Sequence, residues 1–192
     1  MDEAEHLDAV RHDVIDDVFG RVTVTVDGGG GVVTVQGESL PEVTVERRSG
    51  VPLLGYIPIG TRDPAALTLR VAGTTQELNP AKAGLSRRSY RVRARIDSVD
   101  LLLTPNSPTT ARLVRGRSYK PERELGVYER LDDGSVATRW HKDVAVLGVV
   151  AAVARPEPAE AAVGYALAAA FGTGARFFLF ALFAGLGENA PW

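Results

Sequence analysis

Near its C-terminal end the sequence contains a long apolar stretch that cannot lie on a protein surface exposed to water. Residues 161–186 carry a single charged side chain, Arg176, and are otherwise dominated by alanine, leucine, phenylalanine and glycine. A helix that is apolar on every side has to be enclosed, either by protein or by lipid. We therefore expect an apolar helical segment at residues 157–187, and whatever surrounds it determines how the rest of the chain folds.

Three environments are open to this segment. Its length would allow it to span a bilayer, which takes about 20 apolar residues. Gly172, Thr173 and Gly174 interrupt it, Arg176 lies near its middle, and its flanks are acidic, all of which disfavour a simple span. We expect the protein's own strands to enclose it, with membrane insertion and self-association through the helix as the alternatives.

The chain upstream is dominated by short stretches in which β-branched and polar residues alternate. Val22, Val24 and Val26 alternate with threonines, and a glycine-rich turn that begins at Asp27 leads into a second valine-rich stretch, which is typical of a hairpin. Short strands separated by turn signals predict an antiparallel sandwich or barrel over residues 20–154. We expect strands near residues 22–26, 32–35, 43–45, 67–71, 89–96, 98–104, 109–115, 124–130 and 136–141.

The remaining segments complete the expected order of elements. Apolar residues recur at helical spacing between acids in residues 1–19, which predicts an N-terminal amphipathic helix. Residues 49–64, with three prolines and three glycines, and the polar residues 74–89 are expected to be loops. Residues 143–154 are apolar on both faces, so they form either a buried strand or a helix, and their valines favour the strand.

The predicted fold class is therefore mainly β with helices. A single domain over residues 1–192 would combine an antiparallel barrel or sandwich with the N-terminal helix and with an apolar C-terminal helix enclosed by the strands. This layout resembles the tubby C-terminal and scramblase-like superfamily over residues 20–187, on the strand series up to residue 141, the apolar residues 143–154 and the helix that follows. In that superfamily a closed barrel threads a hydrophobic helix through its centre.

The resemblance has consequences for function and also has limits. It implies a non-enzymatic protein that binds membrane lipid or a partner. The break at residues 172–174 and the extra N-terminal helix depart from the superfamily's pattern. No motif aligns with the superfamily, so the resemblance implies no ligand residues in this chain.

Composition limits the chemistry that this chain can perform. The sequence has no cysteine, which excludes disulfides, thiolate nucleophiles and cysteine metal sites. Its first residues are acidic, unlike the basic start of a secretory signal. We therefore expect a cytoplasmic protein, with a peripheral or C-terminally anchored position at a membrane as the alternative.

The sharpest local pattern consists of arginines at every second position. Arg91, Arg93 and Arg95 would project from one face of a strand, and Arg112 and Arg115 could extend the patch. Guanidinium groups in a row suit phosphate or carboxylate recognition. The alternative is a solvated outer face that neighbouring acids neutralise.

Other candidate residues predict no catalytic or metal site. His6 and His12 are six residues apart, a spacing that turns them away from each other on the predicted helix, and His141 stands alone. The glycines that follow Asp27 lack the lysine and hydroxyl residue of a phosphate loop. We expect no cofactor and no metal.

The favoured function is a non-enzymatic binding domain. It would recognise an anionic protein partner or lipid headgroup through Arg91, Arg93, Arg95, Arg112 and Arg115. Nucleic acid is disfavoured because the isoelectric point of the sequence is about 5.9. The alternatives are a membrane protein anchored by the C-terminal helix and a small-molecule enzyme or carrier with an apolar barrel cavity. The sequence does not determine an oligomeric state.

Overall fold

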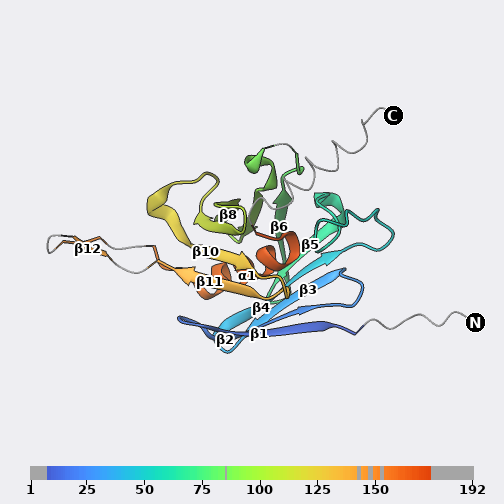
Figure 1. Cartoon of the computed structure of the whole chain (residues 1–192), viewed down its shortest axis with the longest axis horizontal. Coiled ribbons are helices and arrows are strands. Elements are labelled where there is room, and N and C mark those ends of the chain that lie inside the picture. The colour runs from blue at the N-terminus through green and yellow to red at the C-terminus, as the bar shows by residue number, and fades with distance from the viewer. Residues whose placement is uncertain (1–7, 85, 142–143, 147–148, 152–153, 174–192) are drawn as a thin grey trace, which may run out of the picture.

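Eleven antiparallel strands surround a helix in a nearly closed barrel, each strand pairing with the next one along the chain (Figure 1). The computed structural model describes residues 8–84, 86–141, 144–146, 149–151 and 154–173. The barrel strands are β1 (Val10–Asp16), β2 (Gly20–Val26), β3 (Val32–Gly37), β4 (Leu40–Arg47), β5 (Leu67–Val71), β6 (Thr74–Pro80), β7 (Val92–Ile96), β8 (Val99–Pro105), β9 (Thr110–Arg115), β10 (Glu124–Arg130) and β11 (Val136–Trp140).

The loops that connect the strands carry three short 3₁₀ helices, and two further strands follow β11. A separate pair, β12 and β13, lies outside the barrel sheet. The long helix α1 comes last among the described elements. The bounds are η1 (Pro64–Ala66), η2 (Arg87–Tyr90), η3 (Pro121–Arg123), β12 (Val144–Val146), β13 (Val149–Ala151) and α1 (Pro158–Phe171).

The valine alternation in the first half of the sequence produces the inner face of β2, β3 and β4. The register places Val24 opposite Val35, and Val35 opposite Val43, so that these side chains share one face of the sheet. All three are fully buried, whereas the threonines between them are partly exposed. This arrangement confirms the predicted period-two pattern, because one strand face packs on the core and the other meets water.

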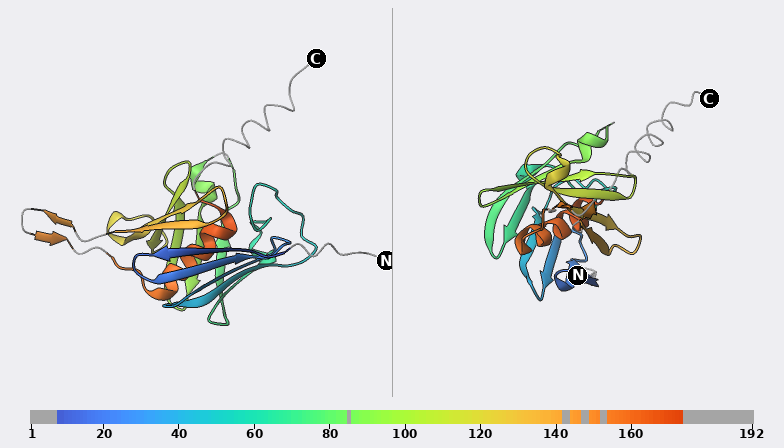
Figure 2. Two further views of the ribbon diagram at one scale, coloured as in Figure 1. Left: turned by 60° about the horizontal axis from the view of Figure 1, so that its bottom comes forward. Right: turned by 90° about the vertical axis from the view of Figure 1, so that its left-hand side faces the viewer.

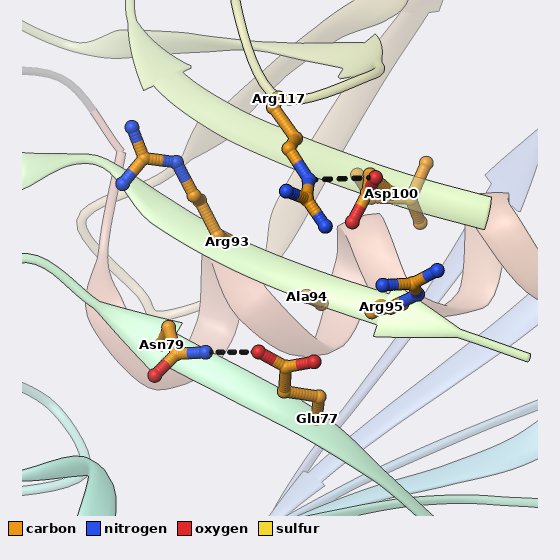
Figure 3. A pocket seen from close by; sticks show the side chains of 8 residues that line it. Glu77, Asn79, Arg93, Ala94, Arg95, Asp100 and Arg117 are labelled. Carbon is orange, nitrogen blue, oxygen red and sulfur yellow. Dashed lines mark hydrogen bonds and ion pairs between the residues drawn. The ribbon is translucent and has the colours of Figure 1, made fainter. Parts of the chain in front are cut away.

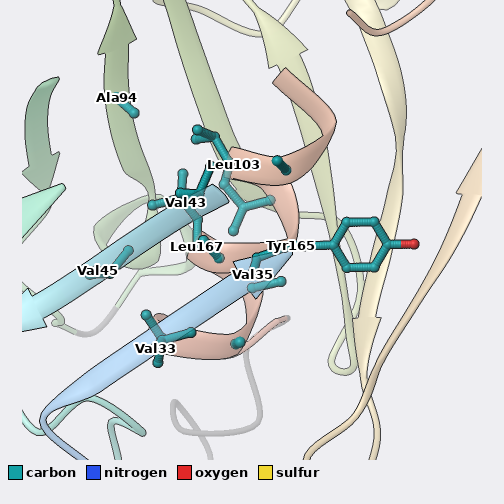
Figure 4. Close-up of a cluster of buried hydrophobic side chains, with 14 of the residues drawn as sticks. Val33, Val35, Val43, Val45, Ala94, Leu103, Tyr165 and Leu167 are labelled. Carbon is teal, nitrogen blue, oxygen red and sulfur yellow. The ribbon is translucent and has the colours of Figure 1, made fainter. Parts of the chain in front are cut away.

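Helix α1 fills the interior of the barrel (Figure 2). It begins with Pro158 and a capping box in which Glu157 and Glu160 bond each other's backbone amides. Every residue from Glu160 to Phe171 is buried, and the helix packs against the valines of β3 and β4 (Figure 4). The helix ends at Gly172, whose φ of +75° suits glycine.

Enclosure by protein is therefore confirmed for residues 158–171. The part of the predicted segment beyond residue 173, with Arg176, lies outside the described residues. Within the described chain, no helix combines the length and the apolar character that crossing a bilayer requires.

The predicted N-terminal helix is wrong for the residues that the structure describes. Residues Val10–Asp16 form β1, which pairs with β2 along its whole length, and residues 1–7 lie outside the described chain. Val10, Val14 and Ile15 fit the spacing of a helix but also favour a strand as β-branched residues. Pairing with the free edge of β2 favours the strand over the helix, because it satisfies the backbone N–H and C=O groups of both strands.

Two other segments differ from their predicted structure. The polar stretch predicted to be a loop contains β6, which the sequence pattern missed because its exposed positions are polar and only Leu78 and Pro80 are buried. The apolar residues 143–154 form neither a single buried strand nor a helix. Their described parts, β12 and β13, pair only with each other in a two-stranded sheet that projects from the barrel (Figure 1).

Side chains, rather than a backbone ladder, join the two edges of the barrel. Among the described residues, no backbone pairing connects β1 with β11. The carboxylate of Asp16 on β1 accepts hydrogen bonds from Thr138 Oγ1 (2.8 Å) and Trp140 Nε1 (2.9 Å) on β11. It also accepts one from Tyr165 Oη (2.6 Å) on α1. Asp16 therefore links both edge strands to the enclosed helix.

Candidate functional site

The arginines of β7 lie on the outer surface of the barrel, as the alternation predicted. Val92, Ala94 and Ile96 are buried, whereas Arg93 is exposed and Arg95 is partly exposed. Figure 3 shows Arg93 and Arg95 projecting from the same side of the strand. Side chains of β6, β8 and the loop after β9 join them around a shallow depression of about 500 Å³.

The two arginines have different neighbours across the sheet. Arg95 lies directly opposite Glu77 on β6 and opposite Asp100 on β8, so that an acid flanks it on both sides. Arg93 lies opposite Asn79 on β6 and Leu102 on β8, neither of which carries a charge. Opposite charges at directly paired positions attract one another. Acids therefore flank Arg95 on both neighbouring strands, although Asp100 itself pairs with Arg117 at 2.9 Å, whereas no acid lies opposite Arg93.

The uncompensated charge extends from Arg93 towards the start of the strand. Arg91, just before β7, donates through Nε to Thr104 Oγ1 (3.1 Å), which leaves the charge itself without a carboxylate. Partial burial, followed by repulsion from Arg88 and Arg93, lowers the pKa of Arg91 below its usual value. We call Arg88, Arg91 and Arg93 the arginine strip. Like charges held this close, with no acid among the groups that shift the pKa, favour an added anion.

The structure does not bring Arg115 into this strip. Arg115 forms a bidentate pair with Glu160 at the start of α1, with Nε and one terminal nitrogen each 2.6 Å from a carboxylate oxygen. The same guanidinium donates to the carbonyl of Arg155 at 2.9 Å. Arg115 therefore links the N-terminal end of the enclosed helix to β9, and Glu160 balances its charge.

Arg112 is likewise engaged elsewhere. Its Nε lies 3.4 Å from Glu124 Oε2 on β10, and its guanidinium stacks over the ring of Tyr119 with 5.0 Å to the ring centre. His141 also contacts Glu124, through Nε2 at 2.8 Å. Arg112 belongs to this separate cluster around Glu124 rather than to an anion-binding face.

Beside Arg93, the outer face of β8 and β9 carries buried apolar side chains. Leu102 and Val114 are paired in register and fully buried, yet they are not part of the core cluster inside the barrel. Arg93, on the neighbouring strand, lies opposite Leu102 on the same face. Apolar side chains beside a guanidinium lower the local dielectric, which strengthens any ion pair formed there.

The described residues hold no group of three or more acids and histidines that could bind a metal ion. His6 lies outside the described chain. His12 lies on β1 beside Gly134, where a methyl group on that glycine would approach the imidazole Nε2 to 3.1 Å.

A second feature was not singled out in the sequence. Arg62, in the loop between β4 and β5, is only 5% exposed and has no carboxylate within 4 Å among the described residues. It lines a pocket with Leu54, Tyr56 and Lys82. The signal in the sequence is a lone arginine at the end of the apolar run from residue 51 to 60.

Comparison with known proteins gives no relative: no protein-family model, curated protein or solved structure matches this chain. The likeness to the tubby-like fold therefore rests on architecture alone. The nearly closed antiparallel barrel of eleven strands with one long described helix is consistent with that fold. Function has to be argued from the chain's own residues.

Proposed function

We propose that this protein is a non-enzymatic binding domain that recognises an anionic ligand at the arginine strip. The observation that carries the proposal is the imbalance along β7, where acids flank Arg95 but not Arg93 or Arg91. The ligand chemistry is a phosphate or carboxylate group, since a planar guanidinium can bond two oxygens of either group at once. The proposed binding face is therefore smaller than the five-arginine face that the sequence predicted. It comprises the N-terminal end of β7 and the residues before it.

The spacing of the strip indicates more than one anionic group on the ligand. Alternate residues of an extended strand lie about 7 Å apart on one face. Arg91 and Arg93 are two residues apart in extended backbone, and Arg88, in η2, is close enough to repel the charge of Arg91. A lipid headgroup in an anionic surface or an acidic peptide segment would each present anions at comparable intervals.

The test compares two arginines on the same face of the same strand. Arg93→Gln removes a charge without acidic neighbours, and we expect about a tenfold loss of affinity for the ligand. Arg95→Gln is the matched control, and we expect less than a twofold change because the carboxylates of Glu77 and Asp100, on the two neighbouring strands, repel an anion at that position. Binding is measured by flotation with vesicles containing 30% phosphatidylserine and, separately, by calorimetry with a poly-glutamate peptide.

The two arms of the test identify the source of the anion. Loss on vesicles alone would indicate a lipid surface, and loss on the peptide alone an acidic partner. Equal effects of Arg93→Gln and Arg95→Gln in both arms, or no binding by the unmodified protein in either, would contradict the proposal. Affinity should also fall as salt rises, because exposed ion pairs are screened over about 10 Å at 0.1 M salt.

A further inference from the structure

The loop between β4 and β5 forms a pocket beside the arginine strip that is distinct in its chemistry. Residues 48–63 fold back over the end of the barrel, and the pocket they shape has a volume of about 430 Å³. Volumes of about 300–1,000 Å³ are typical of small-molecule sites. We call it the Arg62 pocket, and it is lined chiefly by Leu54, Tyr56, Arg62, Pro64, Lys82 and Ala83.

A buried cation lies in the wall of this pocket. Arg62 donates through Nε to the carbonyl of Ala81 (2.7 Å) and through Nη2 to those of Tyr90 and Arg91 (both 3.0 Å). Its guanidinium also lies 5.2 Å from the centre of the Phe171 ring, at the C-terminal end of α1. Burial lowers the pKa of Arg62 to about 10, so the group remains charged at neutral pH.

These contacts anchor the guanidinium but do not neutralise it. Carbonyl dipoles, aromatic rings and the negative end of a helix each compensate only part of a unit charge. Among the described residues, Nε and Nη2 have the hydrogen bonds given above and Nη1 has none. Because Arg62 lines the pocket, Nη1 is the donor that a ligand entering the pocket would bond.

The rest of the lining adds a second cation and an apolar wall. Lys82 is exposed at the rim, and Leu54 and Tyr56 are each 38% exposed. Leu53, in the same loop, is 63% exposed. Asp63 also lines the pocket, and its carboxylate caps η1 by accepting a hydrogen bond from the backbone amide of Ala65 at 3.0 Å. Two cations, Arg62 and Lys82, against this one acid leave the lining with a net positive charge. The pocket thus combines positive charge with apolar surface.

The apolar wall is held in place before any ligand binds. Backbone hydrogen bonds close the loop on itself, from Leu54 to Gly60 (2.7 Å), from Ile57 to Leu54 (2.9 Å) and from Gly60 to Ile57 (2.8 Å). The amide of Ile59 donates to the carbonyl of Ala170 at the end of α1 (2.9 Å). Ile57 and Ile59 are buried as anchors. A preformed wall avoids the entropy of ordering a loop on binding.

From this combination we propose that the Arg62 pocket binds a small organic anion with an apolar body. The carboxylate or phosphate head contacts Arg62 Nη1 and the ammonium group of Lys82, and the body packs on Leu54, Tyr56 and Pro64. A free fatty acid and an alkyl phosphate share this chemistry. The site does not depend on the side chains of the arginine strip, since none of Arg88, Arg91 and Arg93 lines it.

The first experiment separates the contributions of head and body. Calorimetric titrations of the full chain use octanoate, octyl phosphate, 1-octanol and acetate as probes. We expect octanoate or octyl phosphate to bind at least tenfold more tightly than either octanol, which lacks the charge, or acetate, which lacks the body. Octanol binding as tightly as both anions would overturn the proposal, as would the absence of binding by either anion.

The second experiment places the ligand in the pocket. Lys82→Gln should weaken octanoate binding about fivefold while leaving octanol unchanged, and Leu54→Ser should weaken both probes. The matched controls, Lys120→Gln and Leu131→Ser, alter exposed residues of the same kind elsewhere, and they should change neither. Equal effects of the pocket and control variants would overturn the assignment.

A substitution of Arg62 can also destabilise the protein, because its guanidinium bonds three backbone carbonyls. The melting temperature of Arg62→Lys is therefore measured together with its octanoate affinity. Folded Arg62→Lys protein with full octanoate affinity would overturn the role of Nη1. Arg93→Gln should leave octanoate affinity unchanged. That variant distinguishes failure at this pocket from failure at the arginine strip.

Discussion

Asp16 and Arg62 are buried ions of opposite sign that differ in how completely they are hydrogen-bonded. They are 4% and 5% exposed, and neither has an oppositely charged partner among the described residues. Asp16 accepts hydrogen bonds from the backbone amides of Val18 and Phe19. It also accepts them from the side chains of Thr138, Trp140 and Tyr165 at the junction between β1 and β11, which we call the seam. Arg62 donates to three carbonyls and leaves one nitrogen at a pocket.

The pKa values of the two groups show what this difference means. Burial raises the pKa of Asp16, but the hydrogen bonds from Tyr165, Trp140, Val18 and Phe19 outweigh it and bring the pKa below the usual 3.8. The pKa of Arg62 is also lowered, and for a cation that means the charged form is less stable here than in water. A buried ion whose hydrogen-bonding groups all have partners, which we call a saturated ion, stabilises the fold. A buried ion with an unpartnered group, which we call unsaturated, favours binding of a ligand.

The strongest test of this comparison removes the saturated ion. Asp16→Ala removes the acceptor of Trp140 Nε1 and of two backbone amides, and it leaves the hydroxyls of Tyr165 and Thr138 with only each other as partners. We expect the free energy of unfolding to fall by about 4 kcal/mol, because several buried donors lose a charged acceptor at once. Urea denaturation monitored by tryptophan fluorescence measures the change.

The neighbouring Asp17 provides the control for this prediction. It is exposed, so Asp17→Ala should change the stability by less than about 0.5 kcal/mol. Similar losses for the two alanine variants would show that Asp16 does not hold the seam between β1 and β11.

Removing the unsaturated ion should cost less. Arg62→Met keeps an apolar stem beside Phe171 and relieves the burial of a charge, but it frees three carbonyls. We expect a loss of about 2 kcal/mol in the free energy of unfolding, smaller than for Asp16→Ala because water in the pocket can reach part of the exposed polar surface. The same urea experiment measures it.

Arg48→Met alters an exposed arginine at the start of the same loop and should be nearly neutral. A loss for Arg62→Met as large as that for Asp16→Ala would place Arg62 among the purely structural ions and weaken the case for the pocket.

The sequence predicted those parts of the fold that depend on local pattern. The valine strands and α1 follow from periodicity and from the need to enclose an apolar helix. The strand β6 could not be predicted because its pattern is polar apart from Leu78 and Pro80, and β1 fitted helical spacing equally well. In both cases pairing with a neighbouring strand, which no local window shows, determines the outcome.

For the candidate sites, the sequence predicted which residue types are present but not which residues pair with each other. The arginine alternation identified the outer face of β7, but the balance of charge along it depends on the register with Glu77 and Asp100. The side-chain partners of Asp16 lie more than 120 residues away along the chain, and Arg115 meets Glu160 across 45 positions. Such pairs arise from tertiary structure, so spacing in the sequence could not separate bound arginines from free ones.

Acid should weaken the protein through Asp16. A carboxylate whose pKa is lower in the folded state contributes stability that is present above its unfolded pKa and is lost as pH falls through the folded value. For Asp16 that range lies below about 3.8. We expect the free energy of unfolding of the unmodified protein to fall more steeply there than that of Asp16→Asn, which cannot titrate. Parallel pH profiles for the two proteins would contradict the prediction.

The smallest expected effect comes from one donor of the seam. Tyr165→Phe removes the hydroxyl that lies 2.6 Å from Asp16 Oδ2 and 2.8 Å from Thr138 Oγ1, while the ring can still pack edge-on against Tyr128. We expect a loss of about 1.5 kcal/mol, typical of a hydrogen bond to a charged group. Tyr119→Phe also removes a hydroxyl that bonds a carboxylate, that of Glu124, but on an exposed tyrosine, so it serves as the control and should cost less.

The same substitution should also shift the acid response. Among the hydrogen bonds that lower the pKa of Asp16, the one from Tyr165 has the largest effect, so its removal raises that pKa towards its usual value. The loss of stability in acid should then be smaller and should end at a higher pH than in the unmodified protein, because the folded and unfolded pKa values lie closer together. An unchanged acid profile would mean that the other donors already saturate the carboxylate, and the contrast with Arg62 would be sharper still.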